Sequence, residues 1–375
     1  MSEHKDILDA LNKDIPLKAK LVHAHRAIKQ YSPYIARVAI TIYDPETTEL
    51  STYLHTGDDE VSFAHYSELL GNAPSLEKLL KSGQPRVITN MVTSEEGVPA
   101  HIQRVGRHGY ATSYTMPMFN RGVLVGFIFF NSHESDVFQQ EDLNQLDIFG
   151  HMIALMVINE LAAVKTLTAA LKTTGHITHI RDPETGSHLD RMSRYARLIA
   201  AALARDKGLD NEFIEHVFLF SPLHDIGKIA IPDEILLKKD KLTNEEYLVM
   251  RGHAMKGREI VDDLLKNFGL EAIEHVELLR NIASYHHEAI NGGGYPEGRI
   301  GDEIPLEARI VAVADVFDAL TSRRPYKDAW DNDKAFAWLS QVAGEQLDGD
   351  CVDALMRHRE DVEKIQKLFK EDMFG

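Results

Sequence analysis

The sequence predicts two domains of different fold class, an α+β domain followed by an all-α domain. Three observations lead to this prediction. Segments with the alternating, β-branched pattern of strands occur only before Asn131. After Thr174, the apolar residues recur at helical spacing instead. A chain of 375 residues also has the length of about two typical domains.

The first domain is expected to hold an antiparallel sheet with helices at both ends. The stretch Asn120-Arg121-Gly122 is typical of a tight turn between two strands. Antiparallel strands flanked by helices predict an α+β sensor fold. Strands are expected at Ala36–Tyr43, Thr48–Leu54, Arg86–Met91, Ser113–Phe119 and Val123–Phe130, and helices at Lys18–Tyr31, Ser75–Lys81 and from Glu141 onward.

A long helix is predicted between the two domains. Its apolar residues recur every three or four positions, and no proline or clear breaker precedes Gly175. We therefore expect a regulatory domain at residues 1–145, a connecting helix at 146–174 and the helical domain at 175–375. The apolar stripe could pair with a second copy in a parallel homodimer, which we favour, or pack on the chain's own domains. It comprises Leu146, Phe149, Ile153, Val157, Leu161, Val164, Leu167 and Leu171.

The second domain shows helical patterns and no convincing strand. Its helices supply the scaffold for the chemistry described below, because most polar motifs fall near their predicted ends. They are expected at Ser187–Arg205, Asn211–Asp225, Asn244–Leu265, Leu270–His287, Pro305–Ser322 and Asp333–Val342, with a last helix after Cys351.

The composition disfavours several classes of function. The net charge of −17 argues against a binder of duplex nucleic acid, which needs a basic surface. The single cysteine, Cys351, excludes a disulfide scaffold and a cysteine-based zinc site, whereas 19 histidines leave imidazole available as a metal ligand. We expect a cytoplasmic protein without membrane contact. The start of the chain has no apolar signal-peptide run, and no stretch reaches the ~18 apolar residues of a membrane span.

The second domain carries a set of oxygen and nitrogen donors near predicted helix ends. Asp315 lies within the almost wholly apolar run ARIVAVADVFDAL, where a carboxylate calls for a cationic partner. His224 and Asp225 follow another apolar run and precede Gly227, a helix stop. A lone histidine is more often a hydrogen-bonded core residue, but the whole set favours a metal site. Its members are Glu184, His188, His224, Asp225, His253, His286, His287 and Asp315.

The number of donors predicts more than one metal ion. Adjacent residues on a helix point about 100° apart, so His224 and Asp225 should contact different ions, or Asp225 should bridge two. The same reasoning applies to His286 and His287. Eight donors also exceed the roughly four to six that one ion takes. Imidazole with carboxylate suits iron, manganese or zinc, and this mixture favours iron, with manganese as the alternative.

These motifs resemble those of the HD-GYP domain, the branch of the HD superfamily that hydrolyses cyclic di-GMP. The matching runs between Thr173 and Asp350 are ETGSH, HDIGK, HAMKG, HHEAINGGGYP and ADVFDALTSRRPYK. The resemblance implies that the eight donors are metal ligands and that Asp225 bridges two metals. Members with the upstream glutamate can hold three irons, so Glu184 favours three over two. The runs VAITIYD, LVGFIFFNS and FQQEDLNQLDIF in the first domain resemble a GAF domain.

The expected reaction is hydrolysis of the phosphodiester bonds of cyclic di-GMP by a metal-bridging hydroxide, regulated by the N-terminal domain. Lys228, one turn past Asp225, is placed to reach a phosphate oxygen or the leaving group. Arg324 and Lys327 would hold the phosphates. The remaining expectations concern neighbours of the donors. Gly294 and Tyr295 should lie close to the substrate, Asp318 should orient a ligand, and Arg191 should contact the substrate or Glu184.

Some positions depart from the family pattern and leave alternatives open. Asn291 stands where aspartate is commoner, and the family's FDP run appears as LDGD at Leu347–Asp350. The rival functions are hydrolysis of the mixed cyclic GMP–AMP dinucleotide, an inactive receptor for cyclic di-GMP, and a nucleotide phosphohydrolase of the wider superfamily. The product is also open, either the linear dinucleotide or GMP.

Overall fold

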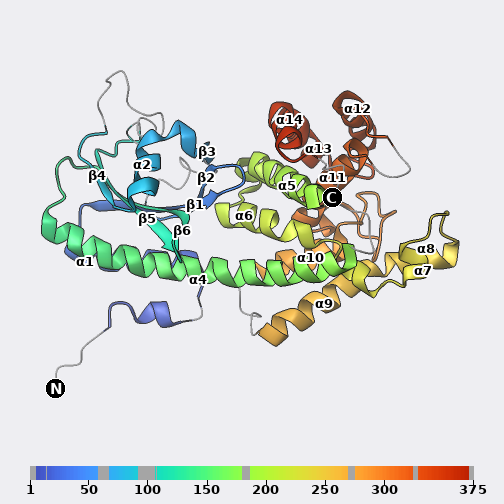
Figure 1. Cartoon of the computed structure of the whole chain (residues 1–375), viewed down its shortest axis with the longest axis horizontal. Helices are drawn as coiled ribbons and strands as arrows, with labels where there is room; N and C mark the ends of the chain where they lie inside the picture. The colour runs from blue at the N-terminus through green and yellow to red at the C-terminus, as the bar shows by residue number, and fades with distance from the viewer. Residues whose placement is uncertain are drawn as a thin grey trace. The chain divides into compact units, whose positions relative to one another are not determined.

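The computed structural model of the chain describes residues 6–13, 15–57, 67–91, 106, 108–179, 186–268, 275–323 and 328–370. The chain divides into two compact units, Met1–Ala162 and Ala163–Gly375, which are described separately below. Figure 1 labels their helices and strands. The boundary between them falls within one helix. The three-part division at residues 145 and 174 stays a prediction.

The first unit is built on a six-stranded antiparallel sheet with the strand order β3-β2-β1-β6-β5-β4. Every strand expected from the sequence is present, although the one expected at Arg86–Met91 already ends at Ile88. The short strand β3 had no recognisable pattern. The strands are β1 (Ile35–Asp44), β2 (Glu49–His55), β3 (Ser67–Leu69), β4 (Arg86–Ile88), β5 (Thr112–Asn120) and β6 (Val123–Ser132).

Helices pack on both faces of this sheet. On one face, α1 (Leu17–Tyr31) and the first part of α4 (Gln140–His179) enclose a core that includes Ile128. On the other face, α2 (Pro74–Ser82) packs against Phe127. Neighbouring residues of a strand point to opposite faces, which explains why Phe127 and Ile128 belong to different cores. Two short 3₁₀ helices, η1 (Asp9–Asn12) and η2 (Leu70–Asn72), complete the unit, and the predicted α+β class is confirmed.

The helix α4 is the most apolar long element of the described chain. Its residues Gln140–Ala162 have a mean hydropathy of 1.2 over the most apolar window, enough by length and composition to cross a membrane. The expectation that no stretch would reach this level was wrong for this helix. Five of its side chains are buried in the core beneath the sheet, so packing accounts for much of its apolar content. They are Leu146, Ile153, Ala154, Val157 and Leu161.

The described residues of the second unit form helices and no β-strand, as predicted. Its elements are α5 (Gly186–Lys207), α6 (Asn211–Phe220), η3 (Ser221–Leu223), η4 (Ile226–Ala230), α7 (Asp233–Leu236), α8 (Asn244–Arg251), α9 (His253–Phe268), α10 (Val276–Tyr285), η5 (Gly301–Glu303), α11 (Leu306–Thr321), α12 (Asn332–Val342), α13 (Gly349–Arg357) and α14 (Arg359–Leu368).

Three helix predictions need correction. The helix expected at Asn211–Asp225 ends at Phe220, and the 3₁₀ helix η3 follows it. The single helix expected at Asn244–Leu265 is broken at Gly252, so that His253 becomes the first residue of α9. The helix that ends before His286 begins at Val276 within the described residues, whereas the expected start at Leu270 lies outside them. The helical periodicity continues across Gly252, which is why the sequence pattern did not reveal that break.

Side-chain caps define where several of these helices begin. Asp210 accepts a hydrogen bond from the backbone of Phe213 at the start of α6, and Thr243 forms a capping box with Glu246 at the start of α8. The core between the helices is apolar and centres on α5 and α11, with Phe317 fully buried. These two helices carry two of the candidate metal ligands described next, His188 and Asp315.

Candidate metal centre

The structure brings seven of the eight predicted donors together in two groups. One group contains Asp225, His253, His286 and His287, and the other contains His188, His224 and Asp315. Within each group, the candidate ligand atoms all lie within 4.8 Å of one another. The donors come from α5, the η3–η4 turn, the start of α9, the end of α10 and the middle of α11. The eighth predicted donor, Glu184, lies outside the described residues.

Four of the histidines are oriented by hydrogen bonds from Nδ1. His224, His253 and His286 donate to the carbonyl oxygens of residues three or four positions earlier, at 2.9, 2.7 and 2.9 Å. The acceptor of His188 is instead a carboxylate oxygen of Asp318, at 2.8 Å. A carbonyl or carboxylate oxygen only accepts, so Nδ1 carries the proton and Nε2 keeps the lone pair that a metal needs.

Asp225 connects the two groups. Its Oδ2 lies 3.2 Å from Nε2 of His224, and its Oδ1 lies 3.2 Å from Nε2 of His253. The ammonium of Lys228 is 2.8 Å from Oδ2. Burial would raise the pKa of Asp225, but the ammonium of Lys228 and the neighbouring imidazole of His224 hold it well below the usual range. The carboxylate is therefore ionised and can bridge two cations.

The polar atoms of the first group fit a cation. Nε2 of His253, Nε2 of His286 and Oδ1 of Asp225 are buried and make no hydrogen bond with any residue that the structure describes. Leaving such groups without a partner costs about 1–3 kcal/mol each. Burial and the neighbouring histidines also lower the pKa of both His286 and His287, which keeps the imidazoles neutral. Neutral imidazoles beside a carboxylate are the ligands that divalent transition metals prefer.

The adjacent His286 and His287 belong to one donor group. Both lie in the group of Asp225, with their ring centroids 4.1 Å apart. They follow directly after the last residue of α10, Tyr285. The expectation that they serve different ions, because adjacent helical residues diverge, stays a prediction.

A buried ionic network supports His188 from behind. Asp318, fully buried and one turn after Asp315 on α11, accepts hydrogen bonds from His188 and from two nitrogens of Arg191, at 2.7 and 2.9 Å. Arg191 also donates to Ser322 and to the carbonyl oxygen of Phe369. Asp318 therefore lies where its predicted role of orienting a ligand requires. Arg191 takes part in this network, and its expected contact with the substrate or with Glu184 stays a prediction.

The glycine-rich loop after His287 is held by a carboxylate that the sequence reasoning did not single out. Glu288 is buried and accepts from the backbone nitrogens of residues 297, 298 and 299, at 2.7, 3.1 and 3.0 Å. A Cβ atom at Gly294 would lie 2.2 Å from the backbone nitrogen of Ala289. Glycine is therefore required at position 294 because the backbone of the same loop passes so close to it. Three consecutive backbone donors near one glutamate were not recognisable from the sequence.

Tyr295 packs beside the donors. Its backbone nitrogen donates to the carbonyl oxygen of His287 at 3.1 Å, and its ring centroid lies 4.7 Å from that of His287. Its predicted contact with the substrate stays a prediction. The same holds for Arg324 and Lys327, which lie outside the described residues.

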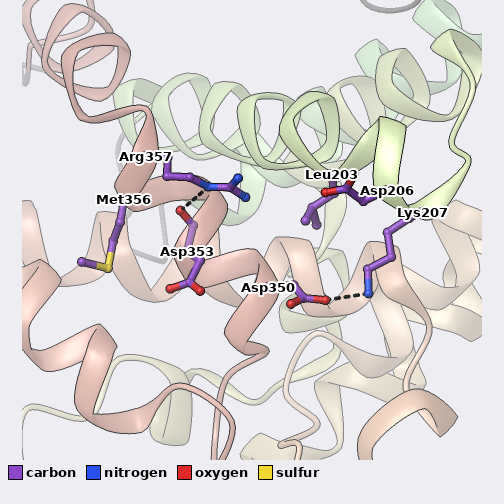
Figure 2. A pocket seen from close by; sticks show the side chains of 7 residues that line it. All are labelled: Leu203, Asp206, Lys207, Asp350, Asp353, Met356 and Arg357. Atoms are coloured by element: carbon purple, nitrogen blue, oxygen red, sulfur yellow. Dashed lines mark hydrogen bonds and ion pairs between the residues drawn. The ribbon is translucent and has the colours of Figure 1, made fainter. Parts of the chain in front are cut away.

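A separate hollow of about 740 Å³ lies between the end of α5 and α13 (Figure 2). Figure 2 shows Lys207 bonded to Asp350, at 2.6 Å, across this hollow. Its lining residue Leu203 is 15 positions after His188 on α5, which corresponds to about 22 Å along a helix. The hollow therefore does not belong to the donor cluster, and its lining contains none of the predicted site residues. The lining consists of Leu203, Asp206, Lys207, Asp350, Asp353, Met356 and Arg357.

Comparisons with known proteins agree with the division into two domains. The HD domain family matches residues 182–351, and the GAF domain family matches residues 30–157. Among curated proteins, the chain is 48% identical over 185 residues to the cyclic di-GMP phosphodiesterase response regulator RpfG of Xanthomonas campestris. It is 40% identical over 200 residues to a probable cyclic di-GMP phosphodiesterase of Vibrio cholerae, and 33% identical over 246 residues to the 3'3'-cGAMP-specific phosphodiesterase 2 of the same organism.

These alignments cover 49%, 52% and 62% of this chain and 46%, 45% and 45% of the three relatives. The chain thus spans about half the length of the curated relatives that it matches. The HD match contains all seven clustered donors, and the GAF match contains all six strands of the sheet. The chain therefore combines an N-terminal GAF domain with a C-terminal HD domain that carries a candidate metal centre.

Proposed function

We propose that this chain hydrolyses the phosphodiester bonds of cyclic di-GMP in a metal-dependent reaction. The observation that carries the proposal is the pair of donor groups joined by Asp225, with Lys228 2.8 Å from its carboxylate. Relatives named as phosphodiesterases of cyclic dinucleotides support the substrate class. The geometry suits phosphoryl chemistry, because two adjacent cation positions and one ammonium can face a phosphate together.

Metal ions at the two donor groups would supply an activated water and stabilise the charge that develops on the phosphate. Asp225 and the oriented histidines would hold these ions and would thereby fix the position of the reacting phosphate. Lys228 lies close enough to Asp225 to donate to the leaving oxygen while that carboxylate stays ionised. Gly294, Tyr295, Arg324 and Lys327 are our candidates for contacting the rest of the substrate.

We propose two ions per chain from the described donors, with a third if Glu184 also binds. Their imidazole and carboxylate chemistry favours iron, with manganese as the alternative. The division of seven donors into groups of four and three supports two positions. The third position depends on the family resemblance alone.

A second candidate substrate is the mixed cyclic GMP–AMP dinucleotide. The relative named as a 3'3'-cGAMP-specific phosphodiesterase favours it, with 33% identity over 246 residues. Both substrates share the same phosphodiester backbone, so the donor cluster serves either. An inactive cyclic di-GMP receptor is the alternative of a different class, and seven clustered donors beside Lys228 argue against it.

The test is turnover by protein purified under low oxygen, with Fe, Mn and Zn counted per chain. Cyclic di-GMP and cyclic GMP–AMP are each incubated with the wild type and with Asp225→Ala, and the nucleotides are separated over time. We expect two or three Fe or Mn per chain and hydrolysis that the variant loses. Bound metal without turnover of either substrate would favour the receptor. A chain that binds no metal after anaerobic reconstitution would overturn the proposal.

We also propose that the chain is a cytoplasmic homodimer whose copies pair through α4, and that the GAF domain regulates the HD domain through this helix. The stripe that was expected to pair is not available for it in this part of the helix, because Leu146, Ile153, Val157 and Leu161 are buried in the chain's own core. The proposed pairing therefore uses another face of α4, on which Ile148 and Leu155 are 71% and 68% exposed and are separated by one heptad. Exposed apolar residues at this spacing are typical of a parallel helical pair.

The oligomeric state tests the pairing directly. Lysine at both Ile148 and Leu155 should convert the dimer to a monomer in light scattering, because two charges would face each other across the seam. Val123→Lys is the matched control, since Val123 is also apolar and 65% exposed but lies in β6. A wild type that is monomeric at all concentrations would contradict the pairing.

A further inference from the structure

One face of α8 borders the loop that carries Tyr295. The guanidinium carbon of Arg251 lies 4.5 Å from the ring centroid of Tyr295 and 6.0 Å from that of Tyr247. Arg251 also donates a weak hydrogen bond to the carbonyl oxygen of Gly294, at 3.3 Å. Tyr247 lies one turn before Arg251 and is 50% exposed. Together Tyr247, Arg251 and Tyr295 form a half-exposed aromatic and cationic cluster, which we call the α8 cluster.

The α8 cluster adjoins the donor groups. The ring of Tyr295 lies 4.7 Å from that of His287 and 6.2 Å from that of His253. His253 follows Arg251 by only two residues, at the break between α8 and α9. The ring of Tyr295 therefore lies between the guanidinium of Arg251 and the candidate metal ligand His287, in contact with both. The distance from the guanidinium to the metal ligands is thus comparable to the distance between the phosphate and the base of one nucleotide.

Arg251 has most of its hydrogen-bonding capacity available. A guanidinium carries five N–H donors, and the bond to Gly294 uses one. Among the described residues, its contacts are this bond and the two aromatic rings, and it forms no ion pair with a carboxylate there. Arg280 and Arg309, by contrast, are each bonded to carboxylates. A half-buried arginine held by a tyrosine ring is oriented for a ligand rather than for a salt bridge.

We propose that Arg251 reads the guanine base of the nucleotide whose phosphate lies at the metal centre, and this inference rests on the proposed function. Guanine presents two acceptors on one edge, O6 and N7, which match the fork of a guanidinium. Adenine presents an amino donor in place of O6 and would repel it. The exposed ring of Tyr247 offers the base a stacking surface. Arg251 thus selects guanine, whereas the metal ligands act on the backbone that all cyclic dinucleotides share.

The experiment compares Arg251→Gln and Arg251→Lys with the wild type on three substrates. Cyclic di-GMP and cyclic di-AMP differ in their bases, and bis(4-nitrophenyl) phosphate has no base at all. We expect Arg251→Gln to lower kcat/KM for cyclic di-GMP about 10- to 100-fold, mainly through KM. Glutamine pairs with adenine, so the preference for cyclic di-GMP over cyclic di-AMP should shrink further. Arg251→Lys keeps the charge but loses the fork, and it should also lose affinity for cyclic di-GMP.

Hydrolysis of bis(4-nitrophenyl) phosphate and the metal content per chain should stay unchanged in both variants. Arg205→Gln, an exposed arginine on α5, controls for the loss of one positive charge. Equal losses on all substrates, or a loss of metal, would show that Arg251 supports the loop and would overturn the inference. Unchanged selectivity would overturn it as well.

Calorimetric binding of cyclic di-GMP separates this inference from the proposed function. If the wild type binds but does not hydrolyse, the proposed function fails, and weaker binding by Arg251→Gln still supports base reading. If the wild type does not bind cyclic di-GMP, both fail. If it hydrolyses cyclic di-GMP and Arg251→Gln does so equally well, only the role of Arg251 fails.

Discussion

At the scale of single residues, Asp318 shows how a buried carboxylate can orient a metal ligand without being a ligand itself. It is fully buried and accepts from His188, Arg191 and Ser322 at once. Burial opposes its charge, but the bonds from His188 and Arg191 lower its pKa nonetheless. The ionised form therefore fixes the tautomer of His188 that presents Nε2 to a metal.

Asp318→Asn should weaken both folding and metal binding. The amide cannot neutralise Arg191, and breaking a buried pair in this way costs about 3–5 kcal/mol. Metal affinity should fall about 10- to 100-fold, because the orientation of His188 is lost. Urea unfolding of the metal-free protein and a calorimetric Mn²⁺ titration measure the two effects. Asp302→Asn, at a 95% exposed carboxylate, is the control and should change stability by at most about 1 kcal/mol. If Asp318→Asn had the same unfolding free energy and the same Mn²⁺ affinity as the wild type, Asp318 would not support His188 in this way.

His216 gives the helical domain a dependence on pH that is separate from the metal centre. It is 2% exposed on α6, where its Nδ1 donates to the carbonyl oxygen of Glu212 at 2.7 Å. Burial, with the nearby ring of His275, lowers its pKa to about 4. An unfolded histidine has a pKa of about 6.5. Between these values the unfolded chain binds the extra proton, so stability is complete above about pH 6.5 and declines as the pH falls towards 4.

His216→Gln should remove this part of the acid sensitivity. Between pH 7 and pH 4.5, the wild type should lose about 2–3 kcal/mol more of unfolding free energy than the variant. Urea unfolding at several pH values measures the difference. The exposed His151→Gln is the matched control and should follow the wild type. A His216→Gln variant that loses as much stability as the wild type over this range would disprove the assignment.

At the scale of elements, the donor cluster depends on how closely η4 and α9 approach. A Cβ atom at Gly227 would lie 1.8 Å from the carbonyl oxygen of His253 and 2.4 Å from the backbone nitrogen of Gly257. Only a residue without a side chain allows this contact. The glycines of HDIGK and HAMKG therefore set the distance between Asp225 and His253.

Gly227→Ala should push these two elements apart. Overpacking against backbone atoms costs about 1–3 kcal/mol or more, since neither backbone can rotate away. We expect lower stability in urea and fewer metal ions per chain. Gly71→Ala is the control, because a Cβ atom there meets nothing within 4 Å. If Gly227→Ala retained full metal binding, the close approach would not be what positions the donors.

The elements also show which features the sequence could predict. Strands and helices with regular apolar spacing were predicted nearly to their ends, as for β1 and α5. The donors were found because a carboxylate such as Asp315 within an apolar helix is costly without a partner. The break at Gly252 and the end of α6 at Phe220 were missed. Both depend on where a helix stops, which is decided by packing such as that of Gly227 on α9 rather than by local pattern.

At the scale of the whole molecule, the two units have separate hydrophobic cores. The core of the second unit is formed by residues of α5, α6, α9, α10, α11, α12, α13 and α14, together with Val164 of α4. The cores of the sheet unit contain none of these residues. Helix α4 contributes only residues before Val164 to them. The seven clustered donors all belong to the second unit. Metal binding should therefore stabilise one unit and leave the other unchanged.

The tryptophans make this expectation measurable in the full chain. The chain has two, Trp330 and Trp338, and both contact the core of the second unit. Their fluorescence consequently reports the unfolding of the helical unit alone, whereas calorimetry detects both units. We expect two calorimetric transitions in the metal-free protein, of which one coincides with the change in fluorescence.

Adding Mn²⁺ under low oxygen should move only the transition that fluorescence reports. A free metal concentration of about a thousand times Kd stabilises the folded form by about 4 kcal/mol, which corresponds to an increase in Tm of roughly 10 °C for a unit of this size. In Asp225→Ala the transition should stay where it is without metal, because the residue shared by both donor groups is gone. If both transitions moved together, the continuous helix α4 would couple the units into one cooperative structure. In that case α4 would be the element through which the GAF domain influences the stability of the metal centre in the HD domain.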